Sequence, residues 1–442
     1  MKAEQMAGKS DVAEDATIRP TLIRAIGRWG LTAVVINSVI GSGIFGMPSA
    51  VAGLVGARSP LAILCAGGCI FIVVLCFAEV GSRFQDAGGP YLYVRETFGA
   101  AVGFQIGWLQ IWTRVLSCAA TLNVLIAYLA PLVPAVRAPA GRALAMTGGM
   151  VLVTAVNVIG VRQASWAVNG FTVAKLAPLL LVALLGGIHF RPEVLATQTV
   201  SAPNWTEAIL LLVFAYGGFE SAVVAASETR NPKRDTAFAL IVAMSAVTAI
   251  YCLVQLAVMG VLPNAARSSA PVAAALGEML GPVGLTIGSL AVVISIYGWL
   301  TGFALMTPRI LFSMAERREL PSVLARVHPR FRTPHAAIAV NSAVALGLGL
   351  YSSFTQAAAL AAISRLGVYG LTCAALIILR KHPDKPAGFH LPGGRIIAVL
   401  GIAFSCWLIS TRSLTQAWLL ALIPGVGALL WVHSRRRRTA PF

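Results

Sequence analysis

Long apolar stretches follow one another along almost the whole chain, and only short polar segments separate them. Most of these stretches are close in length to the roughly 20 residues that a helix needs to cross a bilayer. The expected spans are 31–53, 60–83, 101–131, 143–160, 164–188, 205–227, 237–262, 280–312, 335–351, 357–379, 395–411 and 414–433. The pattern therefore predicts an all-α polytopic membrane protein with about twelve transmembrane helices. Two stretches, 101–131 and 280–312, exceed one span, so we expect tilt or extension beyond the bilayer there.

Glycine-rich segments interrupt two of these stretches near the middle. The first segment runs from Gly41 to Pro48 and the second from Phe214 to Glu220, at the start of the second half of the chain. A lipid-exposed helix must satisfy its own backbone polar groups, so such a break is tolerated only inside protein or beside a water-filled cavity. Paired breaks in corresponding halves are typical of inverted-repeat transporters with a midplane site. The alternative is that the glycines only allow close helix packing.

An unwound turn has a definite chemistry. It exposes amide N–H groups at the start of one half-helix and carbonyl groups at the end of the other, and the helix dipoles add partial charge. A zwitterion fits such a site. The N–H groups around Ser42 and Gly43, with the Ser42 hydroxyl, are candidate donors to a carboxylate.

Composition supports the membrane assignment. The chain is 57% hydrophobic and 11% charged, with a mean hydropathy of +0.80, which excludes an ordinary soluble domain. Its net charge of +18 raises the question of nucleic acid. However, most Lys and Arg residues lie in alternate loops, including the run 435–438, and this distribution predicts cytoplasmic termini and no nucleic-acid partner.

Motifs for metal binding or covalent catalysis are missing from the sequence. The seven cysteines lie in apolar runs without zinc-type pairs, so we expect free, packed thiols. The six histidines form no HExxH pair, and no G-x-S-x-G elbow is present. We therefore expect no metal, no cofactor and no enzymatic activity.

Five segments together resemble the amino acid–polyamine–organocation superfamily of permeases, over essentially the whole chain. They read GSGIFGMP at 41–48, GGPYLYVRETFG at 88–99, FAYGGFESAVVAASETRNPKRD at 214–235, PRILFSMAERRELP at 308–321 and HPRFRTPHAAIAVNS at 328–342. The resemblance implies alternating access for an amino acid or related amine. It also implies two inverted five-helix repeats, 31–188 and 205–379, then two extra helices in 394–433. Cytoplasmic tails are expected at 1–30 and 434–442.

The same resemblance assigns roles at the two breaks. It places the substrate carboxylate at Ser42 and Gly43, and the amino group at the carbonyls of Val39, Phe214 and Gly217. The expected substrate-binding set is Val39, Ile40, Gly41, Ser42, Gly43, Phe214, Tyr216, Gly217 and Phe303. Tyr216, Phe219, Trp299 and Phe303 are candidates for the cavity wall or for ordinary core aromatics, and only Phe303 has a family match. The glycine pair and the scarcity of acidic residues favour neutral amino acids, with a broad or cationic range left open.

Lys175 lies near the middle of the fifth expected span. A charge there costs about 2.5–3.5 kcal/mol on insertion scales, so a role is expected. The resemblance implies that its ammonium replaces a sodium ion, facing carbonyls near Asn37 and Ile40 and a hydroxyl such as that of Ser295. We therefore expect sodium independence. Two roles stay open for Lys175, a proton-coupling group and a permanently charged strut that holds the first span.

Five further charged positions need an assignment. Glu220 follows the second break, and it is expected to gate the site, relay protons or hold neighbouring helices by hydrogen bonds. Glu79 and Arg83 are four residues apart, which favours a structural ion pair. Arg114 and Arg365 are expected to snorkel or bind carbonyls rather than contact substrate, with a position facing the cavity left open for either.

The sequence thus predicts a sodium-independent, proton-coupled secondary carrier for an amino acid in the plasma (inner) membrane. Obligate amino-acid exchange is the nearest alternative. A polyamine or agmatine carrier is disfavoured by the scarcity of intramembrane carboxylates, and a non-transporting amino-acid sensor by the lack of a long signalling tail. The sequence does not identify a partner subunit.

Overall fold

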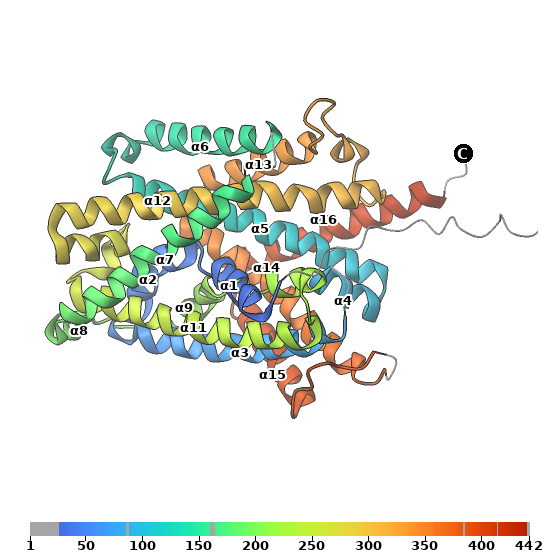
Figure 1. The fold of residues 1–442 in the computed structure, drawn as a ribbon, viewed down its shortest axis with the longest axis horizontal. Helices are drawn as coiled ribbons and strands as arrows, with labels where there is room; N and C mark the ends of the chain where they lie inside the picture. Colours follow the sequence, from blue (N-terminus) through green and yellow to red (C-terminus); the bar gives the residue numbers. More distant parts are fainter. Residues whose placement is uncertain (1–25, 85–87, 160–163, 383–384, 413, 440–442) are drawn as a thin grey trace, which may run out of the picture.

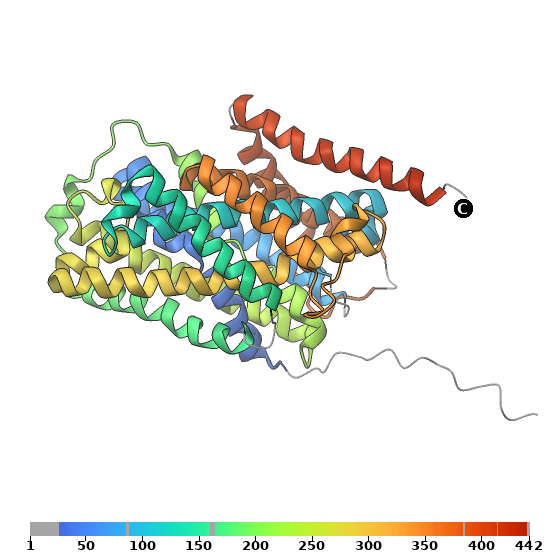
Figure 2. The same cartoon turned by 90° about the horizontal axis from the view of Figure 1, so that it is seen from above.

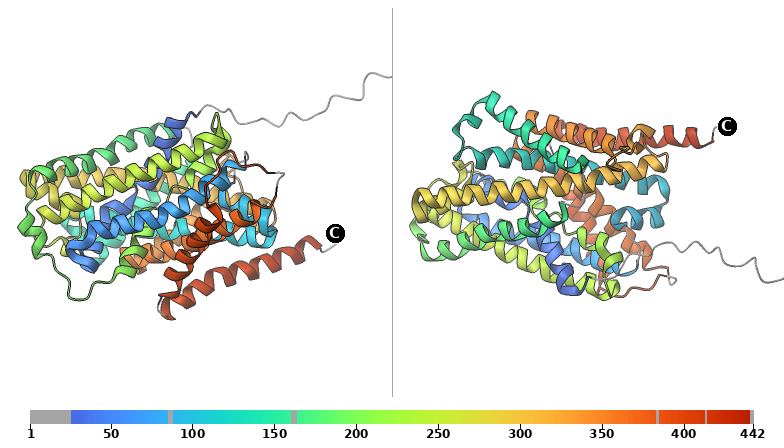
Figure 3. Two further views of the ribbon diagram at one scale, coloured as in Figure 1. Left: turned by 90° about the horizontal axis from the view of Figure 1, so that it is seen from below. Right: turned by 45° about the horizontal axis from the view of Figure 1, so that its top comes forward.

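The computed structural model describes residues 26–84, 88–159, 164–382, 385–412 and 414–439. Every regular element in these ranges is helical, apart from one isolated bridge between Ile26 and Thr229. The long helices run roughly along one direction and form an elongated bundle (Figures 1 and 3). The expectation of an all-α chain is confirmed for the described residues.

The α-helices begin and end as follows: α1 (Arg28–Val39), α2 (Ser42–Val55), α3 (Ser59–Ser82), α4 (Gly89–Phe98), α5 (Ala100–Leu129), α6 (Pro139–Ile159), α7 (Ala164–Ile188), α8 (Pro192–Thr197), α9 (Trp205–Ala215), α10 (Ser221–Val224), α11 (Pro232–Val261), α12 (Pro271–Glu316), α13 (His335–Tyr351), α14 (Phe354–Leu379), α15 (Gly394–Ser410) and α16 (Leu414–Thr439). Short 3₁₀ turns connect some of them, at η1 (Gly56–Arg58), η2 (Pro134–Arg137), η3 (Ala225–Glu228), η4 (Ala265–Arg267) and η5 (Ser322–Ala325). A helix therefore lies at each of the apolar stretches expected from the sequence.

By length and composition, 6 segments of the described chain could cross a membrane. They are Ser42–Ser82, Ala100–Leu129, Pro139–Ile159, Pro232–Val261, Pro271–Glu316 and Phe354–Leu379. Four shorter apolar helices are Lys175–Ile188, Trp205–Ala215, His335–Tyr351 and Gly394–Ser410. The count of twelve spans remains a prediction.

The outer surface of the bundle is apolar. Leu144, Leu184, Ile188 and Leu429 are each more than two-thirds exposed on their helices. Outward leucine and isoleucine side chains suit a hydrocarbon solvent, because lipid removes the penalty that water imposes on them. All seven cysteines are free as expected, but Cys65 and Cys406 are exposed, so the prediction that every thiol is packed is wrong.

Helix α12 changes direction at Gly281. This residue has φ 70° and ψ −160°, a backbone conformation that favours glycine, and Pro282 follows it. The stretch expected from 280 onward is therefore preceded by a further helical segment from Pro271, and the whole element has 46 residues. Its length exceeds one span, as expected.

A buried ionic cluster joins α3, α14 and the segment before α15. The fully buried carboxylate of Glu79 accepts hydrogen bonds from Arg83 Nη2 at 2.7 Å and Arg380 Nε at 2.9 Å. It also accepts one from the backbone N–H of Leu391 at 3.0 Å. The expected Glu79–Arg83 ion pair is confirmed, and Arg380 and Leu391 are partners that the helical spacing could not predict.

Helix α16 lies along the outside of the bundle and packs on α5 (Figure 2). The indole of Trp108 donates to the Ile423 carbonyl at 2.8 Å, and Gln105 Nε2 donates to the Pro424 carbonyl at 3.2 Å. A side chain at Gly427 would collide with Trp108 and Gln105, so the glycine permits this close approach. Helix α16 also contacts α14.

Candidate functional site

The first interruption lies between α1 and α2, as the sequence predicts. Helix α1 ends at Val39, Ile40 leaves the helical conformation with ψ 88°, and Gly41 is extended with φ −121° and ψ −150°. Helix α2 then begins at Ser42, and no side chain caps its first turn. The amide N–H groups at the start of α2 therefore lack side-chain acceptors and point into the break.

The hydroxyl of Ser42 is already engaged. Its Oγ lies 2.7 Å from Thr121 Oγ1 on α5, and the Thr121 hydroxyl donates to the Ser117 carbonyl at 2.7 Å. Because the Thr121 proton is used in that bond, Ser42 acts as the donor to Thr121. Ser42 can thus donate its backbone N–H to a ligand. Its hydroxyl can donate to a ligand only after the hydrogen bond to Thr121 is broken.

The second interruption separates α9 from α10. Helix α9 ends at Ala215, and the next five residues form a turn that leads to Ser221. Gly218 has φ +118°, a conformation that L side chains rarely adopt. The break is thus a local consequence of the glycine pair at 217 and 218.

The two interruptions lie in direct contact inside the bundle. A Cβ on Gly43 would lie 2.7 Å from the Ala215 Cα, and a Cβ on Gly218 would collide with the Ser38 carbonyl. Tyr251 on α11 links them further, because its buried hydroxyl lies 3.1 Å from the Val39 carbonyl and 3.0 Å from the Ala215 carbonyl. The expectation that the breaks meet is confirmed.

Arg365 on α14 lies against the second break. Its Nη1 donates to the Phe214 carbonyl at 3.1 Å, and its guanidinium fills the space where a side chain at Gly217 would lie. The Phe214 carbonyl also accepts the Gly217 N–H at 3.2 Å. Both lone pairs of this oxygen are therefore in use, and the expectation that Arg365 binds a carbonyl is confirmed.

Glu220 is held by three groups. Its Oε1 accepts from the Tyr369 hydroxyl at 2.8 Å and lies 3.5 Å from Arg365 Nε. Its Oε2 accepts from the Gly218 backbone N–H at 2.8 Å. These contacts tie α14 to the turn between α9 and α10, so Glu220 holds neighbouring helices together in this conformation.

Arg114 completes a charged cluster at this place. It lies midway along α5, keeps part of its surface accessible, and interacts electrostatically with Glu220 and Arg365. Among the described residues it makes no hydrogen bond. We use the name charged cluster for Arg114, Glu220 and Arg365 together.

Lys175 lies beside the end of α1 and is 6% exposed. Its Nζ donates to the Asn37 carbonyl at 3.2 Å and to Asn37 Oδ1 at 2.9 Å. The expected contact with Asn37 is confirmed, whereas the Ile40 carbonyl and the Ser295 hydroxyl are not among its hydrogen-bond partners in the described structure. A cation here also complements the negative end of the α1 dipole.

The aromatic candidates divide into two groups. The Tyr216 hydroxyl donates to the Ile63 carbonyl on α3 at 3.0 Å, and the residue is fully buried, so it packs against the neighbouring helix. Phe303 stacks on Trp299 with ring centroids 5.8 Å apart. The Trp299 indole borders the first break, since a Cβ on Gly41 would lie 3.4 Å from its Nε1.

The structure gathers the predicted residues into a closed arrangement. The nine residues of the expected substrate-binding set are all buried. Sequence reasoning missed Tyr251 and Thr121, whose only signal was a polar side chain within an apolar helix. Across the described ranges, no three His, Cys, Asp or Glu side chains gather in a way that could hold a metal ion.

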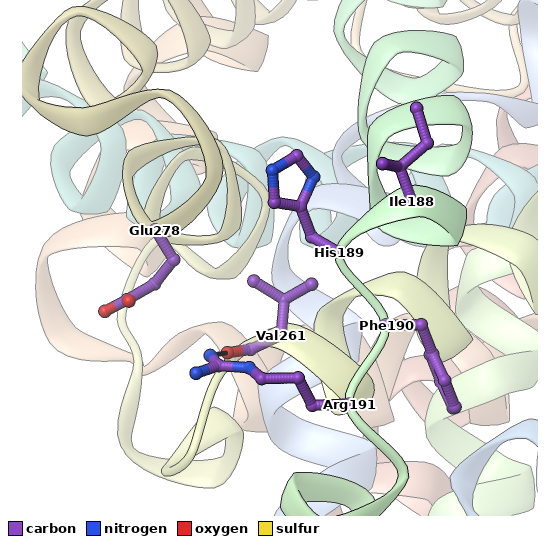
Figure 4. A pocket seen from close by; sticks show the side chains of 6 residues that line it. All are labelled: Ile188, His189, Phe190, Arg191, Val261 and Glu278. Carbon is purple, nitrogen blue, oxygen red and sulfur yellow. Dashed lines mark hydrogen bonds between the residues drawn. The ribbon is translucent and has the colours of Figure 1, made fainter.

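Two surface pockets lie away from the interruptions. Figure 4 shows one of about 310 Å³, lined by Ile188, His189, Phe190, Arg191, Val261 and Glu278. The other, of about 320 Å³, is lined by Gly27, Arg28, Arg230, Asn231, Arg234 and Asp235. Neither includes a residue of the expected substrate-binding set.

Comparison with known proteins gives a consistent result. The family described as Amino acid permease matches residues 26–431. The serine/threonine exchanger SteT of Bacillus subtilis (strain 168) is 28% identical, covering 95% of this chain and 98% of the relative. The methylthioribose transporter of the same organism is 27% identical, covering 94% of each chain. The human large neutral amino acids transporter small subunit 2 is 30% identical, covering 86% of this chain and 75% of the relative. These relatives are transporters and exchangers, which confirms the expectation that the chain is not an enzyme.

Proposed function

Because this chain belongs to the amino acid permease family, we propose that it is a secondary transporter that carries an amino acid across a membrane by alternating access. The observation that carries the proposal is the contact between two interrupted helices deep in an apolar bundle. Free amide donors at one break and carbonyl acceptors at the other suit the two charges of a zwitterion. The family and the apolar helices make the chain an integral membrane protein.

The substrate carboxylate is proposed to bind the N–H groups of Ser42 and Gly43 in the first turn of α2. Ile40 and Gly41, which form the break before this turn, are proposed to line the same site. The ammonium group is proposed to bind the carbonyls of Val39, Phe214 and Gly217. In the closed structure Tyr251 and Arg365 donate to two of these carbonyls. Binding of the substrate ammonium therefore requires Arg365 to give up its hydrogen bond to the Phe214 carbonyl. The Val39 carbonyl can keep its hydrogen bond from Tyr251 on one lone pair and accept from the ammonium on the other. Tyr216 and Phe303 are proposed to shape the cavity when it opens.

Two inverted repeats, 31–188 and 205–379, followed by helices in 394–433, remain our proposal for the topology. Helix packing supports it, since α2 contacts α9, α3 contacts α11, α5 contacts α12 and α6 contacts α13. A pseudo-two-fold axis brings equivalent helices together in this way. We place the tails 1–30 and 434–442 in the cytoplasm of a plasma (inner) membrane, from the distribution of Lys and Arg.

Coupling is proposed to be sodium-independent and proton-linked. The ammonium of Lys175 on the Asn37 carbonyl supports a fixed positive charge where a cation would otherwise bind the end of α1. Obligate exchange is the second candidate, favoured by the name of the SteT relative. Net uptake into empty proteoliposomes against counterflow separates the two, because an exchanger needs internal substrate.

The decisive experiment uses the purified chain in proteoliposomes, with labelled amino acids tested in counterflow. Gly43→Ala should abolish uptake, because its Cβ would meet backbone at Ala215. Gly148→Ala is the matched control, since nothing lies within 4 Å of a Cβ there. Equal uptake by the two variants would refute the site. Failure of the folded, unmodified chain to move any amino acid in either mode would refute the function.

A further inference from the structure

The charged cluster is not balanced. Arg114 and Arg365 bring two positive charges to the second break, and Glu220 brings one negative charge. Glu220 is already shared among Arg365, Tyr369 and the Gly218 N–H. One arginine charge therefore has no counter-charge within the cluster, and this is the charge of the partly accessible Arg114. Such a charge in the middle of an apolar bundle is costly, and its usual solution is an anionic partner.

Arg365 also has unused hydrogen-bonding capacity. Its Nε is buried and makes no hydrogen bond in the described structure, since Glu220 Oε1 lies 3.5 Å away. The bond from Nη1 uses the Phe214 carbonyl, the acceptor that an incoming ammonium group would also need. Two cations cannot share this oxygen, because its second lone pair already accepts the Gly217 N–H. The guanidinium must then find another acceptor.

A neutral amino acid does not provide that acceptor. Its carboxylate is taken by the N–H groups of α2, its ammonium displaces Arg365, and the cluster keeps its net positive charge. A cationic amino acid or a polyamine would add a further positive charge and repel both arginines. A side-chain carboxylate would cancel the excess charge and accept from Arg365 in the bidentate geometry that guanidinium favours.

We propose that the substrate is an α-amino acid whose side chain carries a second carboxylate, which pairs with Arg365 and Arg114 after the substrate ammonium takes the Phe214 carbonyl. This inference rests on the proposed transport function. It replaces the expectation of a neutral substrate, because the sequence pattern does not show that Arg365 and Arg114 lie at the second break.

The test on the unmodified chain compares pairs of nearly equal shape. Purified protein in detergent is titrated with L-glutamate and L-glutamine, L-aspartate and L-asparagine, and L-lysine, while the unfolding midpoint is followed. Ligand that binds only the folded state raises the midpoint. The better acid should reach half its effect at a concentration at least about tenfold lower than its amide, as expected for a lost charged hydrogen bond. L-lysine should have no effect.

The outcomes separate the two claims. Stabilisation by the amides equal to or greater than that by the acids would overturn the inference and leave amino acid transport standing. No stabilisation by any amino acid would count against the proposed function itself. Glutamate and aspartate differ by one methylene group in the side chain. Whichever of them stabilises at the lower concentration shows how far the guanidinium lies from the groups that bind the substrate carboxylate and ammonium.

Variants test the residues. Arg114→Gln should bring the acid-to-amide preference close to one. Arg365→Lys keeps the positive charge and should therefore keep part of the preference. Arg58→Gln, at an exposed arginine in η1, is the control and should change nothing. An unchanged preference in Arg114→Gln would refute its role. If a variant fails to fold, the comparison of acid and amide on the unmodified chain still decides.

Discussion

At the residue scale, three side chains from helices outside the interruptions hold the broken backbone together. Thr121 on α5 accepts a hydrogen bond from the Ser42 hydroxyl. The Tyr251 hydroxyl on α11 lies within hydrogen-bond distance of the Val39 and Ala215 carbonyls. Arg365 on α14 donates to the Phe214 carbonyl. Unwound turns leave backbone groups without partners, and a buried unpaired carbonyl is costly. The scaffold thus supplies partners for the backbone groups of the broken helices.

Replacing Tyr251 by phenylalanine tests this interpretation. The variant removes a hydroxyl whose single proton is shared between two buried carbonyls, so we expect it to lower the free energy of unfolding by about 1–3 kcal/mol. Tyr351→Phe is the control, because Tyr351 is 93% exposed. Thermal unfolding of both variants in detergent measures the difference. Equal midpoints would contradict the bridging role.

Lys175→Met separates coupling from a structural strut. Methionine keeps most of the length of the side chain but removes the ammonium that donates to Asn37. If Lys175 carries the coupling proton, counterflow should persist while acceleration of uptake by an inward proton gradient is lost. A strut would instead give reduced stability and an uptake that keeps its response to the gradient.

At the scale of helices, local signals were predictable and distant partners were not. Glycine clusters at 41–43 and 217–218 weaken helices wherever they stand, so both interruptions could be located from the sequence. The Glu79–Arg83 pair follows from helical spacing. Arg380 joins the same carboxylate from 301 residues away, and no local pattern encodes that contact. No local pattern encodes the hydrogen bond from Arg365 to the Phe214 carbonyl either.

Glu79→Gln should be strongly destabilising. The change removes a fully buried charge and leaves Arg83 and Arg380 facing each other, so a loss of about 3–5 kcal/mol is expected. Glu96→Gln is the matched control, since its ion pair with Lys385 is 45% exposed on the glutamate side, and exposed pairs contribute about 0–1 kcal/mol. Comparable unfolding midpoints for the two variants would contradict the importance of the buried cluster.

At the scale of the whole molecule, the structure is a closed state. All residues expected to bind substrate are buried, and the described pockets lie elsewhere. The sequence could predict which segments meet, because both breaks carry the same glycine signal and family segments. It could not predict closure, since this depends on how Arg365, Tyr251 and Thr121 pack from three separate helices. The excess positive charge of the charged cluster was not predictable for the same reason, because its three residues come from separate parts of the chain.

Trp299 gives this protein an intrinsic fluorescent reporter. Its indole borders Gly41 and stacks on Phe303, so binding at the first break must alter the polarity around the ring. We expect substrate to shift the tryptophan emission of the unmodified chain and to leave that of Trp299→Phe unchanged. Trp29→Phe should keep the response, because Trp29 is 63% exposed and far along α1. A spectral response that survives in Trp299→Phe would mean that occupancy is sensed elsewhere. If the response is lost in Trp299→Phe, the change in emission of one of the nine tryptophans allows the loading of each purified batch to be followed in real time, without any attached dye.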